Sequence, residues 1–242
     1  MKYQTAAMLV IGNEVLSGRT REANAYYAAG KLFEAGCKLA EVAIIPDDRE
    51  AIISTLNRLR AEFDAVITSG GIGPTHDDIT MESIAAAFGV ELIEHSYIVQ
   101  AMTEHFGVEG LNEGRRRMSR VPEGSRLIRC EKTIAPGAHI GNVFILAGVP
   151  YIFESQIDSI LHRFGDKPYQ RIEIEVELPE SLFAKQLTDI QEQFADVEVG
   201  SYPGRCGPNP CGKICLSGQD AERLQQARNS VEQMLEKIST SQ

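Results

Sequence analysis

Apolar and polar positions alternate along the first 90 residues in blocks typical of buried strands followed by amphipathic helices. An apolar strand over 5–12 and a polar loop precede a helix predicted over 21–35, which ends at Gly36. A second strand over 37–45 is followed by a helix with one apolar stripe at helical spacing. An apolar run over 65–67 then begins a third unit. Three strand-loop-helix units in succession predict a parallel sheet with right-handed crossovers.

The pattern between residues 90 and 164 is less regular. A helical pattern over 90–119 is interrupted by three glycines, which leaves its boundaries open. Short strands are expected within 125–146, on either side of a turn at Ala135-Pro136-Gly137. Gly148-Val149-Pro150 breaks the last of these strands, and a helix follows to about Phe164. These elements extend the α/β region to the linker-like segment 165–168.

The texture of the sequence changes after that linker. Residues 171–178 alternate strictly between charged and apolar side chains, which is typical of a strand solvated on one face and therefore of an antiparallel sheet. A helix over about 183–194, two strands and a last helix complete a β-α-β-β-α order. The sequence therefore predicts two domains, 1–166 and a small α+β domain over 167–242. The two strands are expected near 197–202 and 213–216.

The segment 67–80, here called the glycine-rich turn, joins the third strand to the helix after it. Its three glycines permit positive φ and a close approach of the backbone to a ligand. Successive N–H groups and the positive end of the following helix attract an anion, so we expect a phosphate there. Asp77 and Asp78 would repel that phosphate unless a cation lies between them. The turn therefore predicts a phosphate with a divalent metal.

The same residues also have a purely structural interpretation, in which the glycines only make a tight turn and an aspartate caps the next helix. We expect one aspartate of the pair to cap that helix and the other, Asp78, to serve a metal or catalysis. An aspartate of the earlier loop Pro46-Asp47-Asp48 is likewise expected to cap the helix after it. His76 is expected to be exposed. The basic run 115–117, with Arg120, is expected to be a solvated helical face, and the alternatives are that it reaches a substrate phosphate or forms a subunit contact.

Composition bounds the partners of this 242-residue chain. Its formal net charge of −10 argues against a general nucleic-acid or anionic-membrane surface, because such surfaces need a basic field. No apolar stretch approaches the roughly 18 residues that span a bilayer, and the N-terminus lacks a signal-peptide cleavage site. Cys206, Cys211 and Cys215 have no evident fourth zinc ligand, and five cysteines do not indicate a disulfide framework. Buried or spare thiols in a cytoplasmic protein are therefore expected.

The glycine-rich turn, with its string T-S-G-G-I-G-P-T-H-D-D-I-T, resembles the signature of the molybdopterin-binding fold. That fold is shared by the MoaB and Mog proteins, the N-terminal part of CinA and the N-terminal domain of eukaryotic FAD synthase. The resemblance covers about the first two thirds of the chain and implies a three-layer α/β/α domain with a mostly parallel sheet. Further motifs follow in the family's order: Gly12 to Gly18 with Asn24 after it, Pro46-Asp47-Asp48, Ala135-Pro136-Gly137 and Gly148-Val149-Pro150. Two positions depart from the CinA pattern, Ala147 in place of a proline and Ile152 in place of a glutamate.

The resemblance also implies roles for individual residues. Asp47 and Asp78 match the acids held to be catalytic in Mog-type proteins. Asp77 and Asp78 would hold the metal, Mg²⁺ or Co²⁺. The other matched positions would line the site for a nucleotide phosphate or a pterin, and they are Gly12, Asn13, Glu14, Ser17, Ser69, Gly70, Gly71, Gly73, Pro74, Thr75, Gly137, Gly148 and Pro150.

Three activities are implied by this resemblance. The first is metal-dependent hydrolysis of the pyrophosphate of an ADP-containing nucleotide, ADP-ribose or FAD, in which the metal neutralises developing charge. The second is the binding or adenylylation of molybdopterin. The third is a non-catalytic module that binds a nucleotide or a pterin. The expected partners are a small molecule and further copies of the chain in a homo-oligomer, with no nucleic acid and no membrane.

Overall fold

A computed structural model describes residues 2–206 and 209–240, without the side chains of residues 205–210. The chain divides into two compact units, Met1–Asp166 and Lys167–Gln242. Each unit has hydrophobic core clusters of its own. Within the described ranges, no helix is long and apolar enough to cross a membrane.

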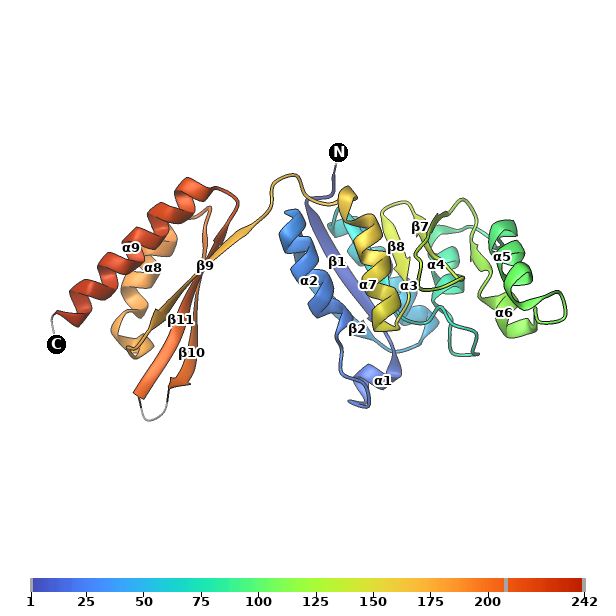
Figure 1. Cartoon of the computed structure of the whole chain (residues 1–242), viewed down its shortest axis with the longest axis horizontal. Coiled ribbons are helices and arrows are strands. Elements are labelled where there is room, and N and C mark those ends of the chain that lie inside the picture. Colours follow the sequence, from blue (N-terminus) through green and yellow to red (C-terminus); the bar gives the residue numbers. More distant parts are fainter. Residues whose placement is uncertain (1, 207–208, 241–242) are drawn as a thin grey trace. The chain divides into compact units, whose positions relative to one another are not determined.

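The N-terminal unit is built on a six-stranded sheet (Figure 1), in the order β2-β1-β3-β8-β7-β6. Strands β2, β1, β3 and β8 run parallel, and β7 and β6 are antiparallel to their neighbours. Every residue of β3 and β8 is buried, which explains why β8 is a continuous apolar run and why β3 begins with three apolar residues. The prediction of a mostly parallel sheet is confirmed. The strands are β1 (Thr5–Ile11), β2 (Lys38–Ile45), β3 (Ala65–Ser69), β6 (Arg126–Ile128), β7 (Gly137–Ile140) and β8 (Val143–Leu146).

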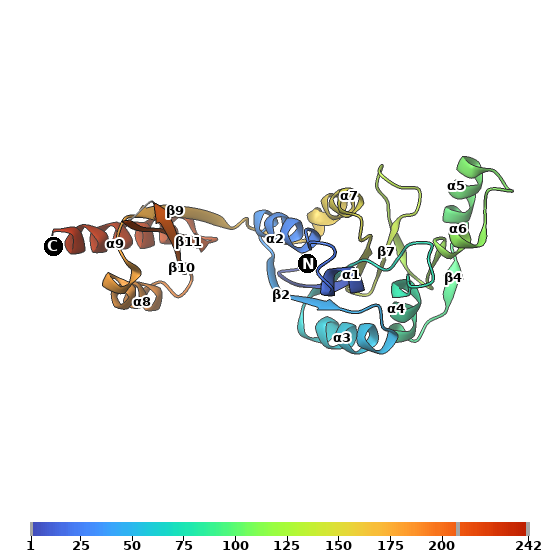
Figure 2. The same ribbon diagram turned by 90° about the horizontal axis from the view of Figure 1, so that it is seen from below.

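Helices cover both faces of this sheet, as Figure 2 shows. On one face lie α2 (Asn24–Ala35) and α7 (Pro150–Ile160), and on the other lie α3 (Arg49–Glu62) and α4 (Thr80–Phe88). Alternate side chains of β1 enter the two cores, because successive residues of a strand point to opposite faces. Met8 and Val10 join the core beneath α2 and α7, whereas Leu9 and Ile11 join the core beneath α3 and α4. The three-layer α/β/α arrangement is thereby confirmed.

The boundaries around the first helix differ from the prediction. α2 begins at Asn24 rather than Arg21, and the loop before it contains a one-turn helix, α1 (Asn13–Leu16). The predicted end is correct, since Gly36 adopts the left-handed conformation with φ of 88°. After α7, a short 3-10 turn over Leu161–Arg163 completes the predicted helical segment.

A helical pattern interrupted by three glycines was expected over 90–119, and that expectation is wrong at its start. Leu92–Glu94 forms the strand β4, which pairs antiparallel with β5 (Arg120–Pro122). Between them lie α5 (Ser96–Phe106) and α6 (Glu113–Arg117), separated where Gly107 ends α5 with φ of 74°. A strand of three residues is too short to show a period of two, so cross-strand pairing decides its conformation.

The C-terminal unit is a three-stranded antiparallel sheet in the order β10-β11-β9, with helices α8 and α9 (Figure 1). Ile174 and Leu216 of the sheet form one core with Ile190 of α8 and Leu224 of α9. The expected antiparallel sheet is confirmed, and its hairpin strands are longer than predicted. Its elements are β9 (Gln170–Val176), a 3-10 turn (Glu180–Leu182), α8 (Ala184–Gln193), β10 (Glu198–Cys206), β11 (Asn209–Gly218) and α9 (Ala221–Ser239).

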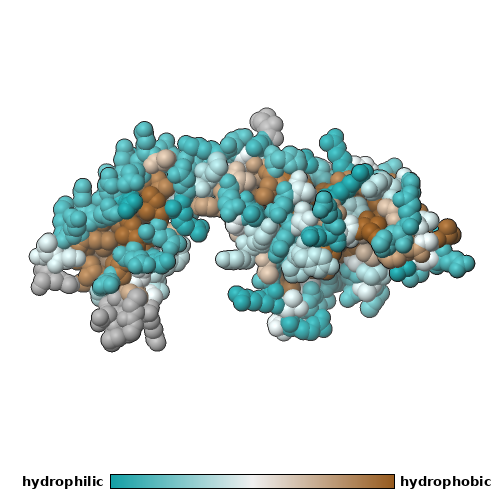
Figure 3. Space-filling model, in the orientation of Figure 1, coloured by the Kyte–Doolittle hydropathy of each residue, from teal (hydrophilic) through white to brown (hydrophobic). Residues whose placement is uncertain are grey.

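Apolar side chains also reach the surface in places. The face drawn in Figure 3 is largely hydrophilic, with apolar residues gathered in separate patches. Tyr26, Val108 and Tyr151 are among the most exposed large apolar side chains, at 87%, 79% and 58%. Because single exposed apolar residues are ordinary on protein surfaces, none of them marks a site by itself.

Candidate functional site

The carboxyl ends of four neighbouring parallel strands form the edge on which the candidate site lies. Because β2, β1, β3 and β8 are adjacent in the sheet, the loops that follow them meet along this edge. Figure 1 shows α1, which follows β1, at the lower end of the sheet. The site therefore brings together segments that lie far apart in the sequence. In sheet order these segments are 46–48, 12–17, the glycine-rich turn and 147–150.

The glycine-rich turn packs tightly against the loops on both sides of it. Gly70 and Gly71 have φ of 103° and 68°, and a Cβ at Gly70 would collide with the carbonyl oxygen of Ile11. On the other side, a Cβ at Gly148 would lie 3.0 Å from the Cα of Gly70. Gly70 therefore requires glycine, and Gly148 leaves little room for a side chain. Gly73 does not share the positive φ of its neighbours, so the expectation of positive φ is wrong there.

The buried side chain of Asn24, at the start of α2, connects two of these loops. Its Nδ2 donates to Ser69 Oγ at 2.8 Å and to the carbonyl oxygen of Gly148 at 2.9 Å. Thr80 Oγ1 donates to the carbonyl oxygen of Gly70 at 2.9 Å and holds the other end of the turn. Ser69 was expected to bind ligand, but it is only 2% exposed and lies behind the turn, where it holds Asn24.

Asp47 and Glu14 lie on the neighbouring loops after β2 and β1. Asp47 Oδ2 accepts a hydrogen bond from the backbone N–H of Asn13 at 2.8 Å, which orients the carboxylate. The Glu14 carboxylate folds back over Gly12, where a Cβ would lie 2.7 Å from Glu14 Oε1. The first loop and the loop of Asp47 are thus joined directly at the edge of the sheet.

The acids of the glycine-rich turn are held by Thr75. Its backbone N–H donates to Asp78 Oδ2 at 2.8 Å, and its hydroxyl lies 2.6 Å from the same oxygen while also contacting Asp77 Oδ1. The bond from the Thr75 hydroxyl is the main cause that lowers the pKa of Asp77, and the charge of Arg117 adds to it. Because a hydroxyl carries one proton, it cannot donate to both carboxylates at once. The turn is therefore rich in oxygen atoms and carries excess negative charge.

Neither of these aspartates caps the helix that follows, so the expectation of a cap is wrong. α4 begins at Thr80, and Ile79 before it makes no side-chain capping bond. The two carboxylates bond to Thr75 within the turn instead. In the earlier loop an aspartate does cap, as expected, because Asp48 Oδ1 accepts from the N–H of Ala51 at 2.8 Å.

The remaining residues expected to line the site differ in exposure. Ser17 and Pro74 are exposed, and Pro150 is the first residue of α7. Gly137 is buried in β7, where a Cβ would lie 2.5 Å from the carbonyl oxygen of Ile145. This glycine serves the packing of β7 on β8. The side chain of His76 is 97% exposed, as expected.

Helix α6 contacts the glycine-rich turn, a feature that sequence reasoning missed. Arg117 Nη2 donates to the carbonyl oxygens of Asp78 at 3.2 Å and of His76 at 3.5 Å. Three residues earlier, Gly114 faces Pro74, and a Cβ there would lie 3.3 Å from Pro74 Cβ. Residues three apart share a helix face, so one face of α6 rests on the turn. The expectation of a solvated basic run is therefore wrong for Arg117.

A hollow of about 90 Å³ lies beside the turn. Gly73 and Asp78 line it from the turn, Pro136 lines it from the segment before β7, and Arg117 and Arg120 add positive charge. Opposite charges and a backbone cradle made by glycine therefore meet at one place. Such an arrangement is suited to an anion that is accompanied by a cation.

Metal-ligand clusters and cysteines were also considered in the sequence. Among the residues that the structure describes, no group of three or more His, Cys, Asp or Glu could hold a metal ion. Cys215 is a free thiol, whereas Cys211 is disulfide-bonded, so the expectation of a thiol is wrong for Cys211. The side chain of Cys206 lies outside the described residues.

Comparison with known proteins places both units. A family model described as a probable molybdopterin binding domain matches residues 7–166, and a model of the FAD synthase middle domain matches residues 168–242. A protein of Archaeoglobus fulgidus is 33% identical over 228 residues, which are 94% of this chain and 96% of that protein. A probable FAD synthase of Caenorhabditis elegans is 32% identical over 259 residues. This match includes 96% of the chain but only 50% of the nematode protein, so the chain spans about half the length of that relative.

A solved structure agrees with these matches. The crystal structure of the protein CinA of Thermoplasma acidophilum superposes with a TM-score of 0.61 at 30% sequence identity. The superposition covers 65% of this chain and 95% of the CinA chain. The chain therefore belongs to the family of the molybdopterin binding domain, and its C-terminal unit is similar to the middle domain of FAD synthase.

Proposed function

We propose that the N-terminal unit hydrolyses the pyrophosphate bond of an ADP-containing nucleotide, FAD or ADP-ribose, with a divalent metal. One observation carries this proposal. The glycine-rich turn, in which glycine is sterically required at Gly70, carries the carboxylate of Asp78. The loops that precede it in the sheet order carry those of Glu14 and Asp47. A backbone cradle binds phosphate, and carboxylates beside it supply a base and metal ligands.

The reaction needs one proton acceptor and a fixed phosphate. Water attacks one phosphorus atom, the bond from that phosphorus to the bridging oxygen breaks, and AMP leaves together with FMN or ribose 5-phosphate. Asp47 is our choice of base, because the N–H of Asn13 holds its carboxylate in one orientation. Asp47 would accept the proton of the attacking water.

The donor atoms of the glycine-rich turn fit a divalent cation. Thr75 Oγ1, Asp77 Oδ1 and Asp78 Oδ2 converge, and all three are oxygen atoms of the kind that Mg²⁺ binds. A positive charge between the two carboxylates, which share one hydroxyl proton, would reduce the repulsion between their negative charges. When bound there, the metal would stabilise the negative charge that develops on the phosphate oxygens.

The substrate class is supported by the C-terminal unit. This unit matches the middle domain of FAD synthase, and the matching nematode protein bears the name of a probable FAD synthase. A flavin nucleotide is therefore the first substrate to test. ADP-ribose contains the same ADP group and is the second.

The test is to incubate the purified chain with FAD or ADP-ribose and Mg²⁺ or Co²⁺, and to follow AMP by chromatography. We expect AMP in equal amount to FMN or ribose 5-phosphate. Asp47→Asn and Asp78→Asn should each lower kcat/KM by about 100-fold or more, the size of a lost acid-base group. Asp48→Asn is the matched control, because asparagine also caps a helix and Asp48 caps α3. Absence of AMP from both substrates with either metal would overturn the proposal.

A second candidate is the binding or adenylylation of molybdopterin, favoured by the family model that matches residues 7–166. The same preparation, given ATP and molybdopterin, would then release pyrophosphate while leaving FAD intact. If neither reaction occurs but FAD or molybdopterin binds, the site is a binding module for a nucleotide or a pterin.

A further inference from the structure

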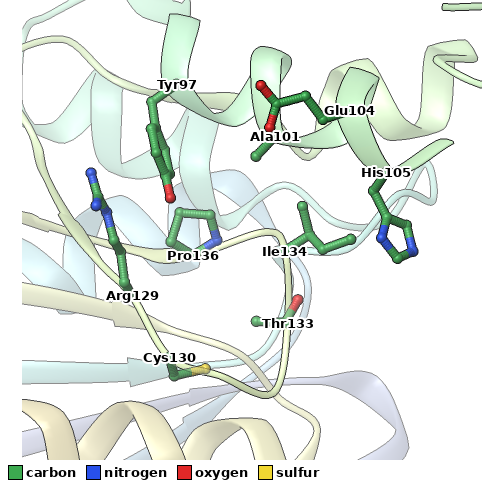
Figure 4. Close-up of a pocket in the computed structure, with 9 residues that line it drawn as sticks. All are labelled: Tyr97, Ala101, Glu104, His105, Arg129, Cys130, Thr133, Ile134 and Pro136. Atoms are coloured by element: carbon green, nitrogen blue, oxygen red, sulfur yellow. The ribbon is translucent and has the colours of Figure 1, made fainter. Parts of the chain in front are cut away.

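A larger pocket lies between one face of α5 and the segment 129–136 (Figure 4). Its volume of about 410 Å³ falls within the roughly 300–1,000 Å³ of small-molecule sites. The lining residues of α5 are spaced at helical intervals, so they share one face of the helix. They are Tyr97, Ala101, Glu104 and His105, opposite Arg129, Cys130, Thr133, Ile134 and Pro136.

This pocket adjoins the glycine-rich turn. Pro136 lines both the pocket and the 90 Å³ hollow that contains Gly73 and Asp78. A third hollow, of about 320 Å³, joins Pro74 of the turn to Ile134, which also lines the pocket. The pocket therefore borders the hollows beside the turn at Pro136 and Ile134.

One end of the pocket offers a stacking surface. The Arg129 guanidinium lies 3.9 Å from the centre of the Tyr97 ring, and Tyr97 is 41% exposed. Figure 4 shows both side chains at the same side of the pocket. Aromatic rings and guanidinium planes bind flat heterocycles by stacking, and the positive charge of arginine favours a nucleotide over a neutral ring compound.

The face of α5 that lines the pocket also offers a hydrogen-bond acceptor. Glu104 is held on α5 by Gln100, whose Nε2 donates to Glu104 Oε1 at 2.8 Å. A carboxylate only accepts hydrogen bonds when ionised, so it selects a ring that carries donors. Ala101 lies one helical turn before this acid, and its small side chain leaves the space between Tyr97 and Glu104 open.

We propose that this pocket binds the adenosine half of the substrate. The base stacks on the pair formed by Tyr97 and Arg129, and its exocyclic amino group donates to Glu104. The choice of adenosine rests on the proposed function, because FAD and ADP-ribose share that half. The location of the subsite rests on the pocket itself.

Binding of AMP and of FMN, measured by titration calorimetry, tests the assignment without any turnover. Tyr97→Ala should lower the affinity for AMP by about tenfold or more, since stacking contributes that much per base. Tyr97→Phe keeps the ring and should bind AMP as the wild type does. Ala101→Leu fills the pocket without removing a contact and should also lower the affinity for AMP. Arg129→Ala should likewise weaken AMP binding. Arg126→Ala is its matched control, because Arg126 is an exposed arginine of β6 that does not line the pocket.

The outcomes separate this inference from the proposed hydrolysis. Loss of AMP affinity in Tyr97→Ala and Ala101→Leu, with thermal unfolding unchanged, supports the subsite even if the chain hydrolyses nothing. Unaltered AMP affinity in both variants overturns it, as does wild-type chain that binds no AMP. Loss of FMN affinity with AMP affinity intact also overturns it, since the pocket would then hold the flavin half.

Discussion

Thr75 and Asn24 each hold several groups of the candidate site in place through one short side chain. Thr75 fixes both aspartates of the glycine-rich turn, and Asn24 joins Ser69 to the carbonyl oxygen of Gly148. The sequence allowed the residue types of the site to be predicted, because paired acids after a glycine-rich strand end are an unusual pattern. It did not allow their partners to be predicted, because an aspartate before a helix is as suited to capping that helix as to bonding within the turn.

His139 is a titratable residue whose ionisation belongs to the stability of the fold. It is 7% exposed on β7, its ring centre lies 4.4 Å from that of Phe144, and its Nδ1 lies 3.2 Å from Arg163 Nη1. Burial, and then the positive charges of Arg163 and Arg126, lower the pKa of His139 to about 4. The folded state therefore holds this imidazole neutral.

Acidification should destabilise the N-terminal unit through this residue. The unfolded chain binds a proton near pH 6.5, whereas the folded chain binds it only near pH 4, so stability falls as the pH drops below 6.5. Between pH 7 and pH 5 the loss should be about 1–2 kcal/mol. Urea unfolding of the wild type and of His139→Gln at both pH values measures it. An equal pH dependence in the two proteins would show that His139 is not the group responsible.

At the scale of elements, α6 illustrates what a residue pattern leaves undetermined. Its three consecutive arginines have three different partners. Arg115 stacks on Phe106 at 3.7 Å, Arg116 pairs with Glu94 at 3.3 Å, and Arg117 bonds to the glycine-rich turn. A basic run on a helix is normally solvated, so its sequence alone indicates no contact. The strands β4 and β5 place α6 here, and β4 is too short to be recognised by periodicity.

Arg117→Ala should lower activity without unfolding the chain. Arg117 bonds to two backbone carbonyls of the turn and also pairs with Glu82 at 3.8 Å. Its loss would release the turn and let the two aspartates change orientation, and small misplacements of catalytic groups cost up to about 100-fold in rate. We expect kcat for the proposed hydrolysis to fall about 10- to 100-fold, with KM changed much less. Arg116→Ala, which breaks only an exposed pair with Glu94, is the matched control.

Hydrogen exchange gives a second measure of this positioning that needs no turnover. The amides of Thr75, Asp78 and Ile79 bond within the turn. Their exchange rates should therefore rise in Arg117→Ala and stay the same in Arg116→Ala. Protection that stays equal in all three proteins would mean that the turn holds its own shape and that α6 merely lies against it.

At the scale of the whole molecule, the two units differ in how well the sequence described them. In the C-terminal unit the antiparallel sheet was predictable because the residues of β9 alternate between charged and apolar. In the N-terminal unit short strands were also expected within 125–146, but the antiparallel pairing of β6 and β7 was not predicted. These strands have three or four residues, and their pairing depends on contacts such as Gly137 on Ile145 rather than on any local period.

The boundary between the units follows from contacts between the first and the last residues of the N-terminal unit. The backbone N–H of Tyr3 donates to the carbonyl oxygen of Arg163 at 3.0 Å, and that of Gly165 donates back to Tyr3 at 2.8 Å. Phe164 between them is 1% exposed and its ring centre lies 5.5 Å from that of Tyr3. Asp166 accepts from Gln4 Nε2 at 2.7 Å. Phe164 and Gly165 are therefore buried parts of this unit, and the exposed Asp166 is bonded to it.

A fragment that ends at Asp166 should consequently fold alone, whereas one that ends at Arg163 should not fold stably. The shorter fragment loses Phe164, whose removal from a core costs about 3–5 kcal/mol, a large share of the stability of a domain of this size. Circular dichroism during heating would show one cooperative transition for 1–166 and a transition lowered by many degrees or absent for 1–163. A fragment 1–166 that melts without cooperativity would mean that the core assigned to this unit is incomplete without residues 167–242. If both fragments fold equally well, the contacts of Phe164 contribute little, and the boundary lies nearer to α7.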